Sequence, residues 1–244
     1  KVIITLILSS LIYFLLGLFD DVYKLSFQKR LFFQFFMAFF IWLNDIRIEN
    51  INFSIFNFEA NLEINNFSSF LLTSIWLVGI INAINWIDGL DGLSSGYVTI
   101  VCIAFLYLSL NFNNYYLGPI LLSIIGSCLG FLKFNFFPSN ILMGDGGSNF
   151  LGSFLAIVSL LALKSPSQSL NLLPSVFLLS IPLLDMIFVI LNRIIKKRSP
   201  FLPDNNHLHH RILNLGLSHK NTVYSIYSLS IFISTLTCII FQDF

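Results

Sequence analysis

Polar side chains recur at intervals of three between residues 82 and 91. The segment reads Asn-Ala-Ile-Asn-Trp-Ile-Asp-Gly-Leu-Asp-Gly-Leu, and it spaces Asn82, Asn85, Asp88 and Asp91 evenly. On a helical or turn-rich backbone this spacing brings the polar groups towards one side. Oxygen ligands on one side suit a hard cation, and the glycines after the two aspartates allow a tight turn or a close approach to a bound group. A polar loop between helices is the plainer alternative.

A pair of adjacent carboxylates stands earlier in the chain. Asp20 and Asp21 open a polar segment that Lys29 and Arg30 close. A general base, or a group that positions an acceptor, fits such a pair. A solvated charge pair at a helix end is the alternative.

A glycine-rich turn carries a further carboxylate. The segment Met-Gly-Asp-Gly-Gly-Ser-Asn, residues 143–149, presents Asp145 just before an expected helix. Ser148 or Asn149 is predicted to cap that helix, whose first amides would favour a phosphate. By itself this turn is a weak signal.

Histidines gather near the end of the chain. If Asn205 or Asn206 caps a helix there, His207, His210 and Arg211 share a face. With His209, these groups can hold phosphate oxygens by charge-assisted hydrogen bonds. Zinc binding is not favoured, because no cysteine or spaced carboxylate completes a tetrahedral set.

The composition places these groups in a membrane protein. Hydrophobic residues make up 56% of the 244 residues, charged residues only 10%, and the mean hydropathy is +0.84. Soluble proteins carry about a quarter charged residues. We therefore expect an all-α, polytopic integral membrane protein with about eight transmembrane helices. The expected spans are Val2–Phe19, Leu31–Leu43, Phe67–Ile84, Tyr97–Phe112, Leu117–Leu132, Phe150–Leu163, Leu172–Leu191 and Val223–Phe241.

Eight crossings place all the polar clusters on one face. Ten of the 13 lysines and arginines fall in the four loops of that face, residues 20–30, 85–96, 133–149 and 192–222. The positive-inside rule makes this face cytoplasmic, and the simplest role of residues 196–198, Lys-Lys-Arg, is to anchor that topology. On the opposite face, partial alternation in Asn44–Asn66 predicts a short hairpin at the membrane surface.

The clusters together indicate phosphoryl transfer. Oxygen ligands for a magnesium-like ion, basic groups for phosphates and glycines for close approach all lie at one membrane surface. That combination fits transfer between a soluble nucleotide and a lipid.

The chain resembles a known family, the polyprenyl-phosphate N-acetylhexosamine-1-phosphate transferases. The motifs that carry the resemblance occur in the family's order: Asp20-Asp21, Asn82-x-x-Asn85-x-x-Asp88-Gly-Leu-Asp91-Gly-Leu, Met143-Gly-Asp145-Gly-Gly-Ser148 and His207-x-His209-His210. They span nearly the whole chain. Residues 199–215 resemble the branch that uses GlcNAc 1-phosphate more than the branch that uses phospho-MurNAc-pentapeptide.

The resemblance implies a role for each motif. Asp145 matches the metal-binding aspartate and Asn85 the asparagine that joins it on Mg²⁺, for which Mn²⁺ could substitute. Asp88 and Asp91 match positions that contact the nucleotide, Asp91 towards the uridine. The implied catalytic set is Asp20, Asp21, Asp88 and Asp145, with Asp20 and Asp21 as base for, or positioner of, the lipid phosphate. Pyrophosphate and substrate binding are implied for Lys29, Arg30, His207, His209, His210 and Arg211.

The implied reaction is attack of undecaprenyl phosphate on the β-phosphorus of a UDP-N-acetylhexosamine, with GlcNAc favoured and UMP released. The product would be a lipid-linked sugar for cell-envelope polysaccharides such as lipopolysaccharide or teichoic acid. The resemblance places the enzyme in the inner, cytoplasmic membrane as a multi-pass protein, without a nucleic-acid partner and with homodimers known among relatives. Residues 1–244 read as a single membrane-embedded transferase domain that lacks the N-terminal helices of relatives, and a first residue Lys1 in place of Met fits that reading.

Some features depart from the family or admit other functions. Leu142 stands where relatives often stack a Phe on the uracil, so base stacking is expected to be weaker or to come from another ring. Asp185 lies inside an apolar run and is a candidate for function or for structural pairing. A transporter would place its polar groups near the membrane midplane, often in repeated halves, and no internal repeat occurs. A non-catalytic scaffold, or the same chemistry on a FucNAc, QuiNAc or phospho-MurNAc-pentapeptide donor, is the further alternative.

Overall fold

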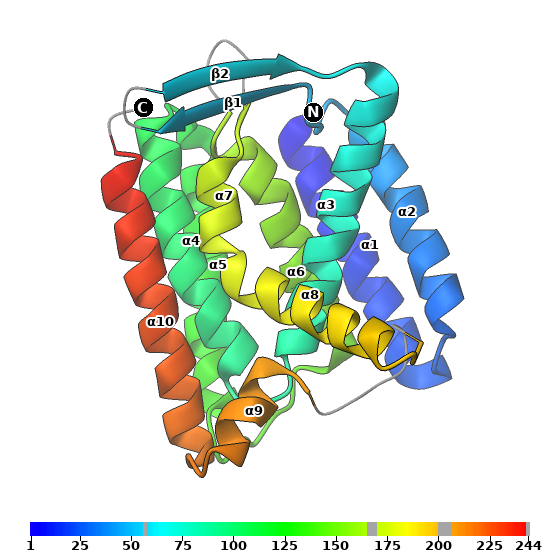
Figure 1. Ribbon diagram of the computed structural model, residues 1–244, viewed down its shortest axis with the longest axis vertical. Coiled ribbons are helices and arrows are strands. Elements are labelled where there is room, and N and C mark those ends of the chain that lie inside the picture. Colours follow the sequence, from blue (N-terminus) through cyan, green and yellow to red (C-terminus); the bar gives the residue numbers. More distant parts are fainter. Residues whose placement is uncertain (56–57, 165–169, 200–205, 243–244) are drawn as a thin grey trace.

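The computed structural model describes residues 1–55, 58–164, 170–199 and 206–242. Helices form a bundle, and a small sheet covers one of its ends (Figure 1). The helices are α1 (Val2–Tyr23), α2 (Phe27–Leu43), α3 (Asn66–Ile87), α4 (Leu93–Asn111), the short 3₁₀ turn η1 (Tyr115–Leu117), α5 (Gly118–Asn135), α6 (Gly144–Leu161), α7 (Leu173–Leu178), α8 (Ser180–Ile195), α9 (Leu208–Asn214) and α10 (His219–Ile240). The strands are β1 (Asn50–Ile55), β2 (Phe58–Glu63) and β3 (Leu170–Asn171).

Five helices of the described chain are long and apolar enough to cross a membrane, namely α1, α3, α4, η1 with α5, and α10. The chain is thus a mainly α-helical, multi-pass membrane protein, but the expected eight spans are not confirmed. The second expected span, α2, has 17 residues and begins with a turn that includes Lys29 and Arg30. The sixth, α6, begins inside the polar glycine-rich segment, which lowers its apolar character.

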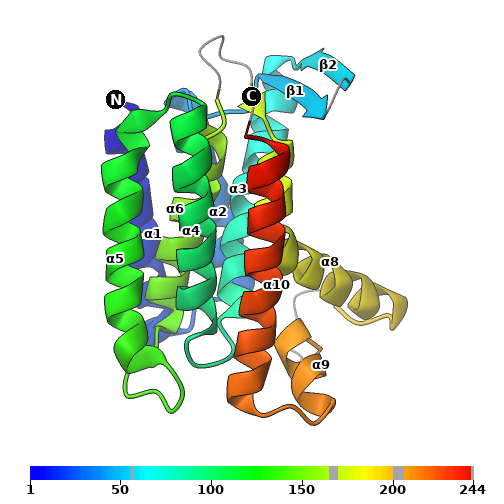
Figure 2. The same ribbon diagram turned by 90° about the vertical axis from the view of Figure 1, so that its left-hand side faces the viewer.

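The expectation of one continuous helix over residues 172–191 is wrong. The chain breaks between α7 and α8, and α8 projects away from the bundle (Figure 2). Pro182 has no N–H to donate to the carbonyl of Leu178, and its ring would clash there in a straight helix. The freed Leu178 carbonyl instead accepts a hydrogen bond from the hydroxyl of Tyr97 at 2.8 Å, so this buried carbonyl keeps a partner.

Helix α6 forms the centre of the bundle. It packs against α1 and α3, while α4 packs against α5 and α10. Nearly every side chain from Leu151 to Leu161 is buried. A Cβ atom on Gly152 would lie 2.9 Å from the Cα of Ile81, so the bare glycine permits the close contact of α6 with α3.

The predicted hairpin in residues 44–66 is confirmed. Strands β1 and β2 pair antiparallel, with Ile51 opposite Leu62. The sequence did not predict β3, whose two residues have no periodicity; Leu170 pairs with Ile51 in parallel. That the hairpin lies at a membrane surface remains a prediction.

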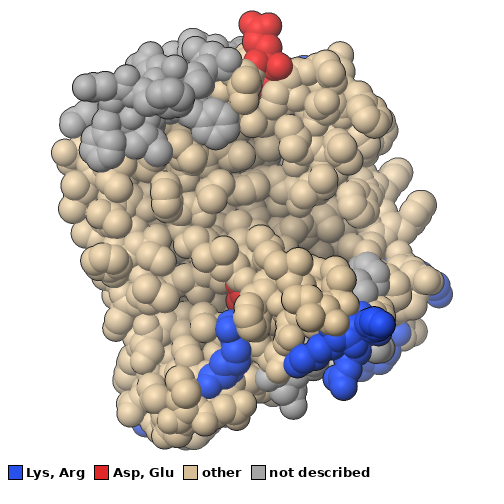
Figure 3. Space-filling view, in the orientation of Figure 1, with Lys and Arg blue, Asp and Glu red and all other residues tan. Residues whose placement is uncertain are grey.

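The polar clusters lie together at the end of the bundle opposite the sheet, which we call the site end. Figures 1 and 2 show the α1–α2, α3–α4 and α5–α6 connections and α9 at this end. Figure 3 shows the lysine and arginine side chains of one face gathered in its lower half, over α8 and α9. The predicted gathering of the clusters at one end is therefore confirmed.

Candidate active site

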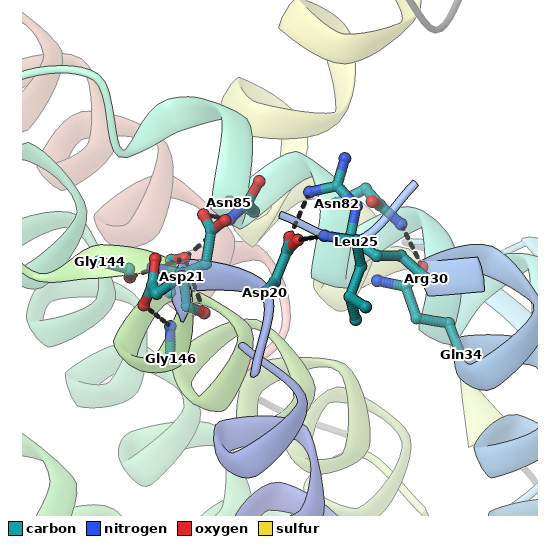
Figure 4. A network of polar contacts seen from close by, with 11 residues as sticks. Asp20, Asp21, Leu25, Arg30, Gln34, Asn82, Asn85, Gly144 and Gly146 are labelled. Atoms are coloured by element: carbon teal, nitrogen blue, oxygen red, sulfur yellow. Dashed lines mark hydrogen bonds and ion pairs between the residues drawn. The ribbon is translucent and has the colours of Figure 1, made fainter. Parts of the chain in front are cut away.

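Helix α1 reaches the start of α6 because both helices carry glycine at the contact. A Cβ atom on Gly17 would lie 2.2 Å from the carbonyl oxygen of Asp145, which leaves no room for any side chain at this position. This contact brings the end of α1 to the first turn of α6. The carboxylate of Asp21 there accepts hydrogen bonds from the backbone N–H groups of Asp145 at 3.1 Å and Gly146 at 3.2 Å (Figure 4).

The start of α6 therefore differs from the prediction. The helix begins at Gly144, whose φ is +66°, so Ser148 and Asn149 lie inside it and do not cap it. Asp21 caps it from 124 residues away. Because these amides are bonded to a carboxylate, which the positive end of a helix dipole favours, they are not free for the phosphate that the sequence predicted.

Asn85 of α3 fixes the side chain of Asp145. Its amide nitrogen donates to Oδ1 of Asp145 at 2.9 Å and to Oγ of Ser148 at 2.8 Å. The family resemblance implied that Asn85 and Asp145 are neighbours at a metal, and the structure brings the two side chains together. The oxygen of the Asn85 amide is the atom left for a cation.

A cavity of about 370 Å³ opens beside these residues. Four carboxylates line it, from Asp21, Asp88, Asp91 and Asp145. Its other lining residues are Lys24, Asn85, Gly89, Leu90, Asn135, Leu142, Met143 and Gly144. Candidate residues from three separate predicted motifs thus surround one space of the size of a small ligand site.

The turn after α3 holds the other two carboxylates. Asp88 accepts a hydrogen bond from Ser94 at 2.5 Å, and Asp91 accepts one from the backbone N–H of Ser139 at 3.1 Å. Burial raises the pKa of Asp88 to about 6, although the Ser94 bond acts in the opposite direction. A cation in the cavity would favour its ionised form.

Asn135 and Tyr227 hold this turn from two other helices. The side-chain oxygen of Asn135 accepts from the N–H of Gly92 at 3.1 Å, and the hydroxyl of Tyr227 donates to the Gly92 carbonyl. Gly92 has φ +79°, a backbone conformation that suits glycine. Neither side chain belongs to a recognisable motif, so the sequence alone gives no signal for their role.

Lys24 is the basic residue that the sequence analysis missed. It ends α1 with φ +49° and is the one basic side chain among the described residues that line the cavity. Its signal in the sequence is its place three residues after Asp21, whereas the family resemblance points to the basic pair at the end of the segment, Lys29 and Arg30. Of that pair, Lys29 is exposed.

Arg30 and Asp20 form an ion pair at 2.8 Å. Asp20 is buried and also accepts from the N–H of Leu25 at 2.8 Å, which closes the turn between α1 and α2. Figure 4 shows Asp20 between Asp21 on one side and Arg30 on the other. The adjacent aspartates thus have different partners: Asp21 accepts from the first amides of α6, and Asp20 pairs with Arg30 of α2.

A second, more apolar cavity of about 210 Å³ begins at Arg30. It lies between α2, α3 and α8, and its lining residues are Phe27, Arg30, Leu31, Val78, Gly79, Asn82, Trp86, Met186 and Ile190. An almost wholly apolar cavity of about 300 Å³ shares Gly79 and Met186 with it and extends towards Ile51 of the sheet. We call these two cavities the apolar groove. The amide of Asn82 lines it while donating to the side-chain oxygen of Gln34 at 2.8 Å.

The histidine segment, residues 207–211, packs against the turn after α3 but not into the carboxylate cavity. A Cβ atom on Gly89 would lie 2.3 Å from Nε2 of His209, so His209 packs directly on that glycine. The ring of His207 lies edge-on to Trp86 with the centroids 5.4 Å apart. Among the described residues that line the carboxylate cavity, none comes from this segment.

Two expectations about this segment change. The helix α9 begins at Leu208 with His207 as its N-cap residue, so Asn206 does not cap it, and Asn205 lies outside the described residues. His209 is buried, and its burial together with the neighbouring histidines lowers its pKa to about 4. It is therefore neutral near pH 7 and does not act as a cation for phosphate.

The residues present fit a magnesium ion that a substrate helps to hold. Within the described chain, no three His, Cys, Asp or Glu side chains lie close enough to make a metal centre alone. Mg²⁺ is commonly held by one or two carboxylates together with substrate phosphates. Asp145, oriented by Asn85 inside a cavity lined by four carboxylates, supplies such a partial set.

The fold and the site together define a multi-pass membrane protein with a carboxylate-lined cavity at one end of its helices. Residues 3–163 match the family described as Glycosyl transferase family 4, and the chain belongs to this family.

Curated relatives are similar over different shares of the chain. A Bacillus subtilis (strain 168) protein, named as a probable undecaprenyl-phosphate N-acetylglucosaminyl 1-phosphate transferase, is 35% identical over 237 residues, which is 96% of this chain and 64% of the relative. The decaprenyl-phosphate N-acetylglucosaminephosphotransferase of Mycobacterium leprae (strain TN) is 40% identical over 179 residues, 66% of this chain and 45% of its own length. A phospho-N-acetylmuramoyl-pentapeptide-transferase of Lactococcus lactis subsp. cremoris (strain MG1363) is 42% identical over 107 residues, 44% of this chain and 32% of its own. The chain thus spans less than two-thirds of the length of these relatives.

Proposed function

We propose that the chain transfers N-acetylglucosamine 1-phosphate from UDP-N-acetylglucosamine to a polyprenyl phosphate. An anionic oxygen of the lipid phosphate forms a bond to the β-phosphorus of the donor. The bond from that phosphorus to the oxygen bridging the α-phosphorus breaks, and UMP leaves with the electron pair. The observation that carries the proposal is a carboxylate cavity beside an apolar groove, with the Asp20–Arg30 pair between them.

The carboxylate cavity suits the nucleotide-sugar. Lys24 supplies a positive charge for the pyrophosphate, and Asp91, held by Ser139, supplies an acceptor for donor hydroxyl or N–H groups. Asp145 and Asn85 would hold Mg²⁺, or Mn²⁺ in its place, which would neutralise the pyrophosphate and the departing UMP. Leu142 is 74% exposed at the cavity, so it offers an aliphatic and not an aromatic surface to a base.

The apolar groove suits the lipid acceptor. Its apolar walls run along α3 and α8 towards the sheet end, and Arg30 lies at its polar end to meet a phosphate. A phosphate monoester has a second pKa of about 6, so the acceptor is already an anionic nucleophile near neutral pH. Asp20 and Asp21 have their oxygens bonded to Arg30, Leu25 and the α6 amides. We therefore assign both a positioning role, and no general base is required.

The charge distribution supports a cytoplasmic site in an inner membrane. The lysines and arginines visible on one face gather towards the site end (Figure 3), and loops rich in these residues stay in the cytoplasm. A UDP-sugar is available on that side. A site at one end of the helices, not at their middle, favours a transferase over a transporter.

A phospho-MurNAc-pentapeptide donor is the second candidate. It is favoured by the match to the Lactococcus lactis protein, which covers 44% of this chain. The GlcNAc proposal has the broader support, because the match to the Bacillus subtilis protein covers 96%.

A transfer assay tests the proposal. Detergent-purified protein is incubated with undecaprenyl phosphate, Mg²⁺ and UDP-[¹⁴C]GlcNAc, and radioactivity in the lipid phase is measured. We expect label in the lipid from the native chain and from Asp45→Asn, a control at the sheet end, and none from Asp145→Asn or with EDTA. Transfer from UDP-MurNAc-pentapeptide but not from UDP-GlcNAc would replace the donor, and no transfer from a panel of UDP-sugars by folded protein would contradict the chemistry.

A further inference from the structure

Asp185 of α8 is a buried carboxylate with three donors from the histidine segment. It accepts from the backbone N–H of Leu208 at 2.6 Å, from Nδ1 of His207 at 2.9 Å and from the guanidinium of Arg211 at 3.2 Å. Its side chain is 3% exposed. These bonds join α8, one wall of the apolar groove, to the histidine segment, which packs against the turn after α3.

The first of these bonds caps α9 from another helix. The N-cap residue of α9, His207, makes no capping hydrogen bond with its side chain. A helix of seven residues is marginal without outside support. The Asp185 carboxylate supplies a hydrogen-bond acceptor and a negative charge at the N-terminus of that helix, and both stabilise it.

The second bond sets the proton on His207. An ionised carboxylate can only accept, so Nδ1 of a neutral His207 carries the hydrogen and Nε2 keeps its lone pair. The ring is 12% exposed and packs edge-on against Trp86. Trp86 itself lines the apolar groove together with Arg30. The orientation of His207 is thus fixed from α8 at the polar end of the groove.

We propose that Asp185 is a positioning residue for the transfer reaction, acting through His207. It holds the histidine ring in one tautomer beside Trp86 and Arg30, where the acceptor phosphate would lie. Met186 and Ile190 of the same helix line the groove, so a lipid seated there contacts the helix that positions the histidine. This inference rests on the proposed function for its kinetic consequence, but the tautomer itself does not.

Asp185→Asn tests the inference with little change in shape. The amide oxygen can still accept from Leu208, whereas its NH₂ group, turned to His207, would need Nδ1 as an acceptor and would reverse the tautomer. We expect kcat to fall about 10- to 100-fold, with KM for UDP-GlcNAc changed less than about 3-fold. Asp45→Asn is the matched control, because it makes the same substitution in an exposed aspartate that pairs with Lys1 at the sheet end. It should leave both constants unchanged.

A double-mutant cycle with His207→Ala separates positioning from a merely structural role. If Asp185 acts through His207, then Asp185→Asn should lower kcat less than about 2-fold in the His207→Ala background. Two losses that multiply would overturn the proposal. So would a wild-type kcat in Asp185→Asn.

The tautomer of His207 can also be measured directly, without any assay of catalysis. We would record ¹⁵N-histidine NMR spectra of the native chain at pH 8.5, above the ordinary titration range of histidine, and assign His207 by its absence in His207→Gln. We expect a proton on Nδ1, and a proton on Nε2 alone would overturn the proposal even if Asp185→Asn does not fold. If the native chain shows the expected tautomer but no transfer from any donor, the proposed function fails and the Asp185–His207 arrangement stands.

Discussion

The carboxylate cavity and the histidine segment are held in place by different means. In the cavity, Asp145 of α6 is hydrogen-bonded both to Asp21 of α1 and to Asn85 of α3, so the contacts cross three packed helices. The described polar contacts of the histidine segment converge instead on one carboxylate, Asp185 of α8. Changes to these cavity bonds should therefore reduce stability and activity together, whereas changes to the bonds of Asp185 with the histidine segment should reduce activity with less effect on folding.

The largest effect is expected at Gly17. Its Cβ would lie 2.2 Å from a backbone oxygen of α6, so Gly17→Ala must push α1 away from Asp145. We expect a loss of stability of about 1–3 kcal/mol and loss of transfer, measured by thermal unfolding in detergent and by the lipid-label assay. The control is Gly126→Ala in α5, where a Cβ would meet nothing within 4 Å. Equal effects of the two changes would refute the close-contact account.

Asn85→Ala should have the next largest effect. It removes the bonds to Asp145 and Ser148, so we expect transfer to fall about 100-fold and the Mg²⁺ concentration for half-maximal rate to rise. A stability loss of about 1–3 kcal/mol should accompany it, because buried polar groups lose their partner.

The matched control for Asn85→Ala is Asn82→Ala, one turn earlier on α3. It loses a bond of similar length to Gln34, outside the carboxylate cavity. Its Mg²⁺ requirement should stay unchanged. A shift in both variants would show that Asn85 has no special part in holding the cation.

A comparison of Lys24 with Lys29 tests whether the positive charge that binds the UDP-sugar lies in the cavity or at the surface. Lys24→Gln removes the positive charge lining the cavity, and we expect KM for the UDP-sugar to rise about 10-fold, as for one lost charge-assisted contact. Lys29→Gln, at an exposed position in the first turn of α2, should change this KM less than 2-fold. Steady-state kinetics at fixed acceptor measures both, and the reverse order would restore Lys29 as the pyrophosphate ligand.

The smallest effect is expected at His209. Its pKa of about 4 means that it gains a proton only well below neutral pH, so it lends no charge to a phosphate near pH 7. His209→Phe keeps a ring against Gly89 and should leave the rate and KM within about 3-fold. The pH profile between 6 and 8 should also be unchanged. A large rise in KM confined to this variant would show that the imidazole contacts substrate.

The regular spacing of Asn85, Asp88 and Asp91 predicted that these polar groups meet, because it depends on local helix and turn geometry, and all three line the carboxylate cavity. Asn82 was wrongly grouped with them, since its amide bonds to Gln34 and lines the apolar groove. The cap of α6 could not be found in this way, since its acceptor, Asp21, is 124 residues distant in sequence. The kink before α8 left a local signal, Pro182, but the carbonyl it frees is satisfied by Tyr97 from another helix. The fold was thus predicted where periodicity determines it, and missed where a tertiary contact does.

The most direct test of phosphosugar transfer is a double-label experiment. UDP-GlcNAc carrying ³²P at the β-phosphate and ¹⁴C in the sugar is incubated with the detergent-purified chain, undecaprenyl phosphate and Mg²⁺, and both labels are counted in the lipid phase. We predict that ³²P and ¹⁴C enter the lipid in equal molar amounts and that UMP is the nucleotide released. Entry of ¹⁴C without ³²P, with release of UDP, would contradict attack at the β-phosphorus.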